Sequence, residues 1–179
     1  EDHSENEIKG YFKMALERLF DVGITNVFFT PFDLNQHLHA DGSGEAMMDF
    51  LSYIGPLGDG DGFTEGVLPN AIEQTQQGLM RFNCADSLDR TNLATFYYSM
   101  KFAAEWCKMM KIGLTNTPDA DPNQPNLIID QIIIDFLAEA FVTSGNVVSR
   151  MYTNTPAIKV NAIKKFSPSI VVTQSDTNI

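Results

Sequence analysis

A cysteine and an arginine lie near the middle of the chain with five residues between them, at Cys84 and Arg90, and Thr91 follows the arginine directly. A loop of this length between a strand and a helix can turn successive backbone N–H groups inward at a helix N-terminus, which creates an anion site. The planar guanidinium of Arg90 can hold two phosphate oxygens at once, which a lysine could not do. The spacing therefore predicts a phosphate-binding loop.

The same surroundings are expected to make Cys84 a nucleophile. Backbone amides, the helix dipole and the charge of Arg90 would favour the thiolate, which can attack a phosphorus atom held in line with it. The predicted reaction is hydrolysis of a phosphate ester in two steps, through a thiophosphate enzyme intermediate that water then breaks down. The competing interpretation is that Cys84 is a buried structural cysteine. The spacing of Arg90 and Thr91 after Cys84 favours the role of nucleophile.

The leaving oxygen needs a proton, and Asp86 is the predicted general acid because it lies beside the nucleophile. The alternatives are Asp89, Asp33 and Asp59. Asp89 is instead expected to brace the loop, either by accepting backbone N–H groups or by pairing with Arg81.

The remaining residues of the loop have predicted supporting roles. Thr91 is expected to donate its hydroxyl to the sulfur of Cys84 when the intermediate breaks down, or otherwise to serve as a residue of the helix N-terminus. Asn83 and Asn92 are expected to fix the shape of the loop through side-chain to backbone hydrogen bonds. Arg81 would reach either a second phosphate or a carboxylate of the loop. The residues expected to contact the substrate are Arg81, Asn83, Ala85, Ser87, Leu88, Asp89 and Thr91.

The twelve residues Arg81–Asn92 resemble the signature of the Sac-domain phosphoinositide phosphatases. That signature reads arginine, asparagine, cysteine, aspartate, a second cysteine, leucine, aspartate, arginine, threonine and asparagine in this order. Ser87 stands where most members have the second cysteine, a variant that resembles a plant and protist branch and removes one possible redox partner of Cys84. Two other segments, Phe32–Asn35 and Gly145–Ala157, resemble further motifs of this family less closely.

The resemblance covers roughly Phe28 to Ala157 and implies several properties of the chain. It implies an α/β fold, a mixed sheet flanked by helices and rich in helix, in which the catalytic loop joins a central strand to a long helix. It implies removal of phosphate from the inositol ring of a phosphoinositide head group, at a membrane surface, with no metal and no cofactor. Family members carry a large N-terminal subdomain that this chain lacks, so residues 1–179 are expected to be the catalytic part of a Sac domain that the missing subdomain completes in cis.

The composition limits these hypotheses. With 179 residues, 44% of them hydrophobic, the chain can bury one sizeable core and is expected to be a single domain. The two cysteines, Cys84 and Cys107, give no disulfide framework, so a cytoplasmic setting is expected, and the resemblance implies a position peripheral to membranes. No stretch is expected to be apolar for long enough to cross a bilayer. The net charge of −11 argues against nucleic acid as a partner, and it is unfavourable for binding at a negative membrane surface.

The elements that position the loop are predicted from hydrophobic spacing and from turn residues. Helices are expected over Ile8–Phe20 with a stop at Gly23, over Glu45–Tyr53, over Leu93–Met110 with an end near Gly113, and over Ile128–Phe141 with a stop at Gly145. Short strands are expected at Val27–Phe29 and at Gly78–Phe82, the second of which delivers the loop. Cys107 lies on the apolar face of its helix and is expected to pack as a small hydrophobic residue. His37 and His39, near Asp41, are interpreted as ordinary polar residues, so no metal site is predicted.

Two other functions remain open. The same loop would allow a phosphatase that acts on soluble inositol phosphates or on phosphoproteins. A phosphoinositide-binding or scaffold module that has lost turnover belongs to a different class.

Overall fold

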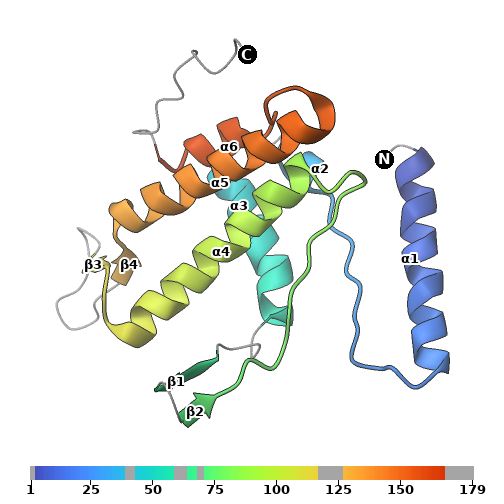
Figure 1. Ribbon diagram of the computed structural model, residues 1–179, viewed down its shortest axis with the longest axis horizontal. Helices are drawn as coiled ribbons and strands as arrows, with labels where there is room; N and C mark the ends of the chain where they lie inside the picture. Colours follow the sequence, from blue (N-terminus) through green and yellow to red (C-terminus); the bar gives the residue numbers. More distant parts are fainter. Residues whose placement is uncertain (1–2, 39–42, 59–63, 68–70, 117–126, 168–179) are drawn as a thin grey trace.

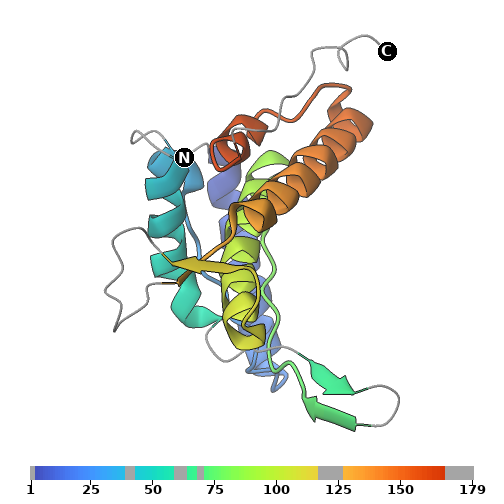
Figure 2. The same ribbon diagram turned by 90° about the vertical axis from the view of Figure 1, so that its left-hand side faces the viewer.

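The structure, a computed structural model, describes residues 3–38, 43–58, 64–67, 71–116 and 127–167. Helices dominate it (Figure 1). In chain order the elements are α1 (His3–Asp21), α2 (Leu34–Leu38), α3 (Ser43–Ile54), the 3-10 helix η1 (Gly55–Leu57), β1 (Glu65–Val67), β2 (Ala71–Gln74), α4 (Asp89–Met110), β3 (Leu114–Asn116), β4 (Leu127–Ile129), α5 (Gln131–Thr153) and α6 (Val160–Lys164). The long helices α4 and α5 pack against each other, and α3 and α6 pack against α4 (Figures 1 and 2). Figure 1 shows α1 apart from these helices.

The hydrophobic core lies along one face of α4. Its fully buried residues Leu93, Phe96, Tyr97 and Cys107 recur at the spacing that keeps side chains on one side of a helix. This confirms the helix predicted over Leu93–Met110. It also confirms that Cys107, which is 1% exposed, packs as a small hydrophobic residue. The aromatic rings that contact this face come from α3, α5 and the residues after α6, and they are Phe50, Phe141 and Phe166.

The helices predicted near the start of the chain are confirmed by α1 and α3. Gly23 follows α1 with a φ of 85°, and its N–H bonds the carbonyl oxygen of Phe20 at 2.9 Å. A glycine reaches this left-handed conformation without a steric cost, which is why it ends the helix.

The predicted α/β fold with a mixed sheet is wrong. In the part of the chain that the structure describes, strands pair only as β1 with β2 and β3 with β4, which makes two separate antiparallel ribbons. Gly78–Phe82, the expected central strand, contains no strand, and neither does Val27–Phe29. The ring of Phe82 instead packs against the rings of Phe50 and Tyr98. The apolar residues before the loop are therefore held by helices, and the loop does not follow a sheet.

The boundaries of α5 also differ from the prediction. Ile128 and Ile129 belong to β4, where they pair with β3, and the helix continues through Gly145 to Thr153. Gly145 was expected to stop the helix, but it is buried in the contact with α4. A Cβ atom at this position would lie 2.6 Å from Nδ2 of Asn92, so a larger residue here would have to displace the Asn92 amide.

By length and composition, α5 is apolar enough to cross a membrane, which overturns the expectation that no stretch would be. Core helices of water-soluble proteins pass the same test. In this structure α5 packs against α4 and α6 and buries Ala138, Val142 and Gly145, but most of its apolar stretch is not buried.

Candidate active site

The predicted phosphate-binding loop leads directly into the first turn of α4, which begins at Asp89. Ser87 adopts a φ of 55°, and Leu88, the residue before the helix, has φ −104° and ψ −103°. Both values lie outside the common regions for residues other than glycine. The N–H of Ser87 bonds the carbonyl oxygen of Cys84 at 3.3 Å, which closes the turn. The loop thus places Cys84 near the N-terminal end of a long helix, where backbone N–H groups and the helix dipole favour anions.

Cys84 is half-buried, and its backbone and its sulfur both contact Thr91. The Thr91 hydroxyl accepts the backbone N–H of Cys84 at 2.9 Å and donates to Sγ at 3.2 Å. Because Thr91 lies in the first turn of α4, these bonds fix the start of the loop to the helix. The hydroxyl has the contact that its predicted role requires, and its part in turnover stays a prediction.

Asp86 is the second partner of the sulfur. The thiol of Cys84 donates to Oδ1 of Asp86 at 3.0 Å, and the same oxygen accepts the N–H of Leu88 at 3.1 Å. The hydrogen bond from Cys84 is the main cause that holds the pKa of Asp86 below its ordinary value of 3.8, and the Leu88 N–H acts in the same direction. Asp86 is therefore ionised at neutral pH in this arrangement. A general acid must carry a proton, so the predicted role requires that Asp86 first gains one.

Arg90 contacts a residue that sequence reasoning missed. Its Nη2 donates to Oε1 of Glu5, in the first turn of α1, at 2.6 Å. This hydrogen bond is the largest cause that raises the pKa of Arg90, and the charges of Glu5 and Asp86 act in the same direction, against the effect of burial. Glu5 and Arg90 are 85 residues apart, and no local pattern in the sequence links them.

The other loop residues contact both the rest of the protein and one another. Oδ1 of Asp89 accepts the N–H of Ile158 at 2.9 Å, so Asp89 braces the start of α4 against the segment between α5 and α6. This is one of the two roles expected of Asp89. The other, a pair with Arg81, is not seen, because the Nε of Arg81 donates to Oδ1 of Asn83 at 3.2 Å. Ala85 is exposed, as a residue at the tip of a loop would be.

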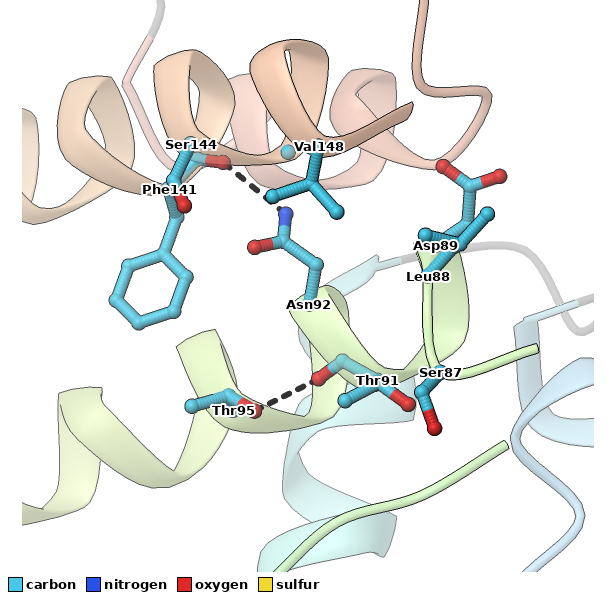
Figure 3. Close-up of a pocket in the computed structure, with 10 residues that line it drawn as sticks. Ser87, Leu88, Asp89, Thr91, Asn92, Thr95, Phe141, Ser144 and Val148 are labelled. Carbon is cyan, nitrogen blue, oxygen red and sulfur yellow. Dashed lines mark hydrogen bonds between the residues drawn. The ribbon is translucent and has the colours of Figure 1, made fainter. Parts of the chain in front are cut away.

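A cavity of about 240 Å³ lies between the first turns of α4 and the middle of α5 (Figure 3). It is lined by Ser87, Leu88, Asp89, Thr91, Asn92, Thr95, Phe141, Ser144, Gly145 and Val148. Asn92 points from α4 toward α5, where its Nδ2 donates to the carbonyl oxygen of Phe141 at 3.0 Å. This is a side-chain to backbone bond, but it joins two helices and does not shape the loop as expected. The side chain of Thr91 points away from α5 (Figure 3), so the hydroxyl that contacts Cys84 faces away from this cavity.

Two other residues considered in the sequence analysis, Asp33 and His37, lie in contacts outside the loop. Asp33, an alternative general acid, accepts the N–H of Gln36 at 3.0 Å and so supports the first turn of α2. His37 bonds Oδ2 of Asp49 at 2.9 Å and stacks on Phe32. Among the residues that the structure describes, no three histidine, cysteine, aspartate or glutamate side chains are grouped to hold a metal ion. Asp59, His39 and Asp41 lie outside the described residues.

Comparison with known proteins gives a partial similarity. No family model matches the chain, and no solved structure matches it. The phosphatidylinositol-3-phosphatase SAC1 of Arabidopsis thaliana is 33% identical over 82 residues, which make up 46% of this chain and 8% of that protein. The chain thus spans less than a tenth of the length of this relative. The similarity supports a distant relation to Sac-domain proteins.

Proposed function

We propose that this chain removes a phosphate group from the inositol ring of phosphoinositide lipids through a cysteinyl-phosphate intermediate on Cys84. One observation carries the proposal: the sulfur of Cys84 lies before the N-terminus of α4 with the hydroxyl of Thr91 at 3.2 Å, and Arg90 lies in the first turn of that helix. The name of the Arabidopsis relative suggests the class of substrate. Because such a substrate is a membrane lipid, the reaction would take place at a membrane surface, with the chain bound peripherally on the cytoplasmic side.

In the first step, Sγ of Cys84 attacks the phosphorus atom and the bond from phosphorus to the ring oxygen breaks. The thiol proton passes to Oδ1 of Asp86, which lies 3.0 Å away, and Asp86 then gives this proton to the leaving ring oxygen. The exchange explains how a carboxylate with a lowered pKa can act as a general acid, because its proton comes from the nucleophile.

In the second step, water attacks the phosphorus atom and the bond from sulfur to phosphorus breaks. Asp86, ionised again, accepts a proton from the water, and the Thr91 hydroxyl stabilises the leaving sulfur by donating a hydrogen bond to it. Arg90 holds two phosphoryl oxygens in both steps. Backbone N–H groups at the start of α4 add to the positive potential around the phosphoryl group.

A phosphate-binding module without turnover is the second candidate, and one contact favours it. Oδ1 of Asp86 accepts the thiol of Cys84, and this contact holds Asp86 ionised, so the loop of this structure has no protonated general acid.

The test is release of inorganic phosphate from a panel of phosphoinositides in vesicles, a soluble inositol phosphate and a phosphopeptide. We expect release from a phosphoinositide by the wild type and none by Cys84→Ser, with the far-UV circular dichroism of the variant unchanged. Arg90→Lys is expected to lower both kcat and substrate affinity, because lysine cannot hold two oxygens at once.

Undiminished release by purified Cys84→Ser would end the assignment of the nucleophile. Release from the phosphopeptide or the soluble inositol phosphate alone would change the substrate. Binding of phosphoinositide without release from any substrate would identify a binding module.

A further inference from the structure

Arg90, the residue proposed to hold the phosphoryl group, already has an anionic partner within the chain. Its Nη2 contacts Oε1 of Glu5 at 2.6 Å, and the two side chains are 26% and 33% exposed. A carboxylate oxygen at this distance takes an N–H of the guanidinium that a phosphate oxygen would otherwise accept. Glu5 therefore competes directly with a phosphate group for Arg90.

A second carboxylate occupies other donors of the loop. Oδ1 of Asp86 accepts both the N–H of Leu88 and the thiol of Cys84. Together, Glu5 and Asp86 provide carboxylate oxygens for three donors: the Leu88 N–H, the Cys84 thiol and one N–H of Arg90. These three donors are thus satisfied by carboxylates of the protein itself, and a phosphate group that uses them would have to replace those carboxylates.

The helix that carries Glu5 is loosely attached to the rest of the molecule. No side chain that the structure describes in α1, residues 5–21, is buried. Tyr11 is 65% exposed, and the ring of Phe12 stacks on Phe29 in the segment that follows the helix. Figure 1 shows α1 apart from the other helices, with its N-terminal end toward the loop and a long extended segment between α1 and α2. Because little apolar surface lies between α1 and the core, moving α1 away exposes little of it.

We propose that α1 is an intramolecular inhibitor, in which Glu5 occupies Arg90 in the resting chain and a phosphate group must displace Glu5 before the loop can bind it. The inference rests on the proposed function, because it assigns a regulatory contact to the same site. Competition of this kind is modest: an ion pair that is partly exposed weakens the binding of a competing anion by about two- to fivefold. The gain in phosphate affinity would be larger if a partner pulled α1 away and freed Arg90 completely.

The test is a calorimetric titration of the wild type and of Glu5→Gln with inorganic phosphate. Glu17→Gln is the matched control, because it removes the same charge from the same helix about three turns further along. We expect Glu5→Gln to bind phosphate about two- to fivefold more tightly than the wild type, and Glu17→Gln to bind as the wild type does. Hydrogen exchange gives a second readout, since the amides of α1 should exchange faster when phosphate is added to the wild type.

Each outcome separates this inference from the proposed function. Equal dissociation constants for the wild type and Glu5→Gln, with binding lost in Arg90→Ala, would overturn the inhibitor role and leave the proposed hydrolysis standing. Tighter binding by Glu5→Gln, without phosphate release from any phosphoinositide, would overturn the hydrolysis and support α1 as the gate of a binding site. Absence of phosphate binding by all variants would overturn both.

Discussion

Asp86 and Thr91 give the sulfur of Cys84 one acceptor and one donor. The thiol donates to the carboxylate, and the hydroxyl of Thr91 donates to the sulfur. In the proposed reaction the first contact moves the proton that the leaving oxygen needs, and the second stabilises the sulfur when it leaves phosphorus. At the scale of residues, one sulfur atom therefore has the partners for both steps.

The contact between Cys84 and Asp86 can be tested by titration. Cys84→Ala should raise the pKa of Asp86 toward 3.8, because the hydrogen bond from Cys84 is the largest cause of its lowering. A carbon-detected NMR titration of the Asp86 carboxyl group measures this directly. Cys84→Ser is the control, since a serine hydroxyl can still donate. If the pKa of Asp86 is the same in the wild type and in Cys84→Ala, the contact does not exist in solution.

The same shift has a consequence for stability. The pKa of Asp86 is lower in the folded chain than its ordinary value of 3.8. The ionised carboxylate therefore adds to the free energy of unfolding above pH 3.8, and this contribution is lost as the pH falls through the folded pKa. The difference in unfolding free energy between the wild type and Asp86→Asn should therefore be constant at neutral pH and should shrink below about pH 4. Urea unfolding of both proteins across this range measures it.

The part of the site that the sequence revealed is the part encoded by local spacing. Cys84, Asp86, Arg90 and Thr91 lie within eight consecutive residues, so their chemistry could be predicted together. Glu5 could not be predicted, because only the fold brings α1 to the first turn of α4. The ionised state of Asp86 was also missed, since it depends on hydrogen bonds that residue types alone do not specify.

At the scale of elements, the contact between α4 and α5 holds the helix whose first turn forms part of the site. Asn92 donates from α4 to the carbonyl oxygen of Phe141 in α5, and Gly145 leaves room for its amide group. A glycine inside a helix costs about 1 kcal/mol relative to alanine. Here that cost is offset by close packing and an interhelical hydrogen bond.

Gly145→Ala is expected to destabilise the fold, although alanine is the better helix former. The new methyl group would displace Asn92, and losing a partly buried hydrogen bond costs about 1–3 kcal/mol, against a gain of about 1 kcal/mol from helix propensity. In the Asn92→Ala background the obstacle is gone, so the same change should stabilise by about 1 kcal/mol. Urea unfolding of the four proteins completes the cycle.

Gly10→Ala is the control for this cycle, because a Cβ atom there meets nothing within 4 Å outside its own helix backbone. Stabilisation by Gly145→Ala in both backgrounds would show that Asn92 does not press against α5.

The elements were predicted well where their pattern is local and poorly where it is not. Apolar residues at helical spacing identified α1, α3 and α4, because each helix makes its own hydrogen bonds. A strand needs partners that are remote in sequence, so the expected strand at Gly78–Phe82 was inferred without the neighbours it would require. The role of Gly145 was predicted wrongly for the same reason. The sequence of α5 alone does not distinguish a glycine that ends a helix from one that lies in a close contact with another helix.

At the scale of the whole molecule, a chain with a net charge of −11 is proposed to bind a phosphorylated lipid. Charges that are far from the site matter little, because interactions between exposed charges are screened beyond about 8 Å at physiological ionic strength. The balance is set near the loop, where Arg90 and the N-terminus of α4 attract an anion while Glu5 and Asp86 repel it. Movement of α1 would change this balance by removing one negative charge from the site.

In the proposed reaction, Cys84 carries the phosphoryl group during turnover. The most direct measurement is rapid quenching of the protein during turnover of a phosphoinositide, followed by mass spectrometry of the peptide that contains Cys84. Thr91→Val should accumulate the intermediate, because the sulfur leaves without its hydrogen bond. We predict a phosphoryl group on Cys84 in the wild type, more of it in Thr91→Val and none in Cys84→Ser. Phosphate release without any phosphoryl group on this peptide, in the wild type and in Thr91→Val alike, would show that Cys84 is not the nucleophile.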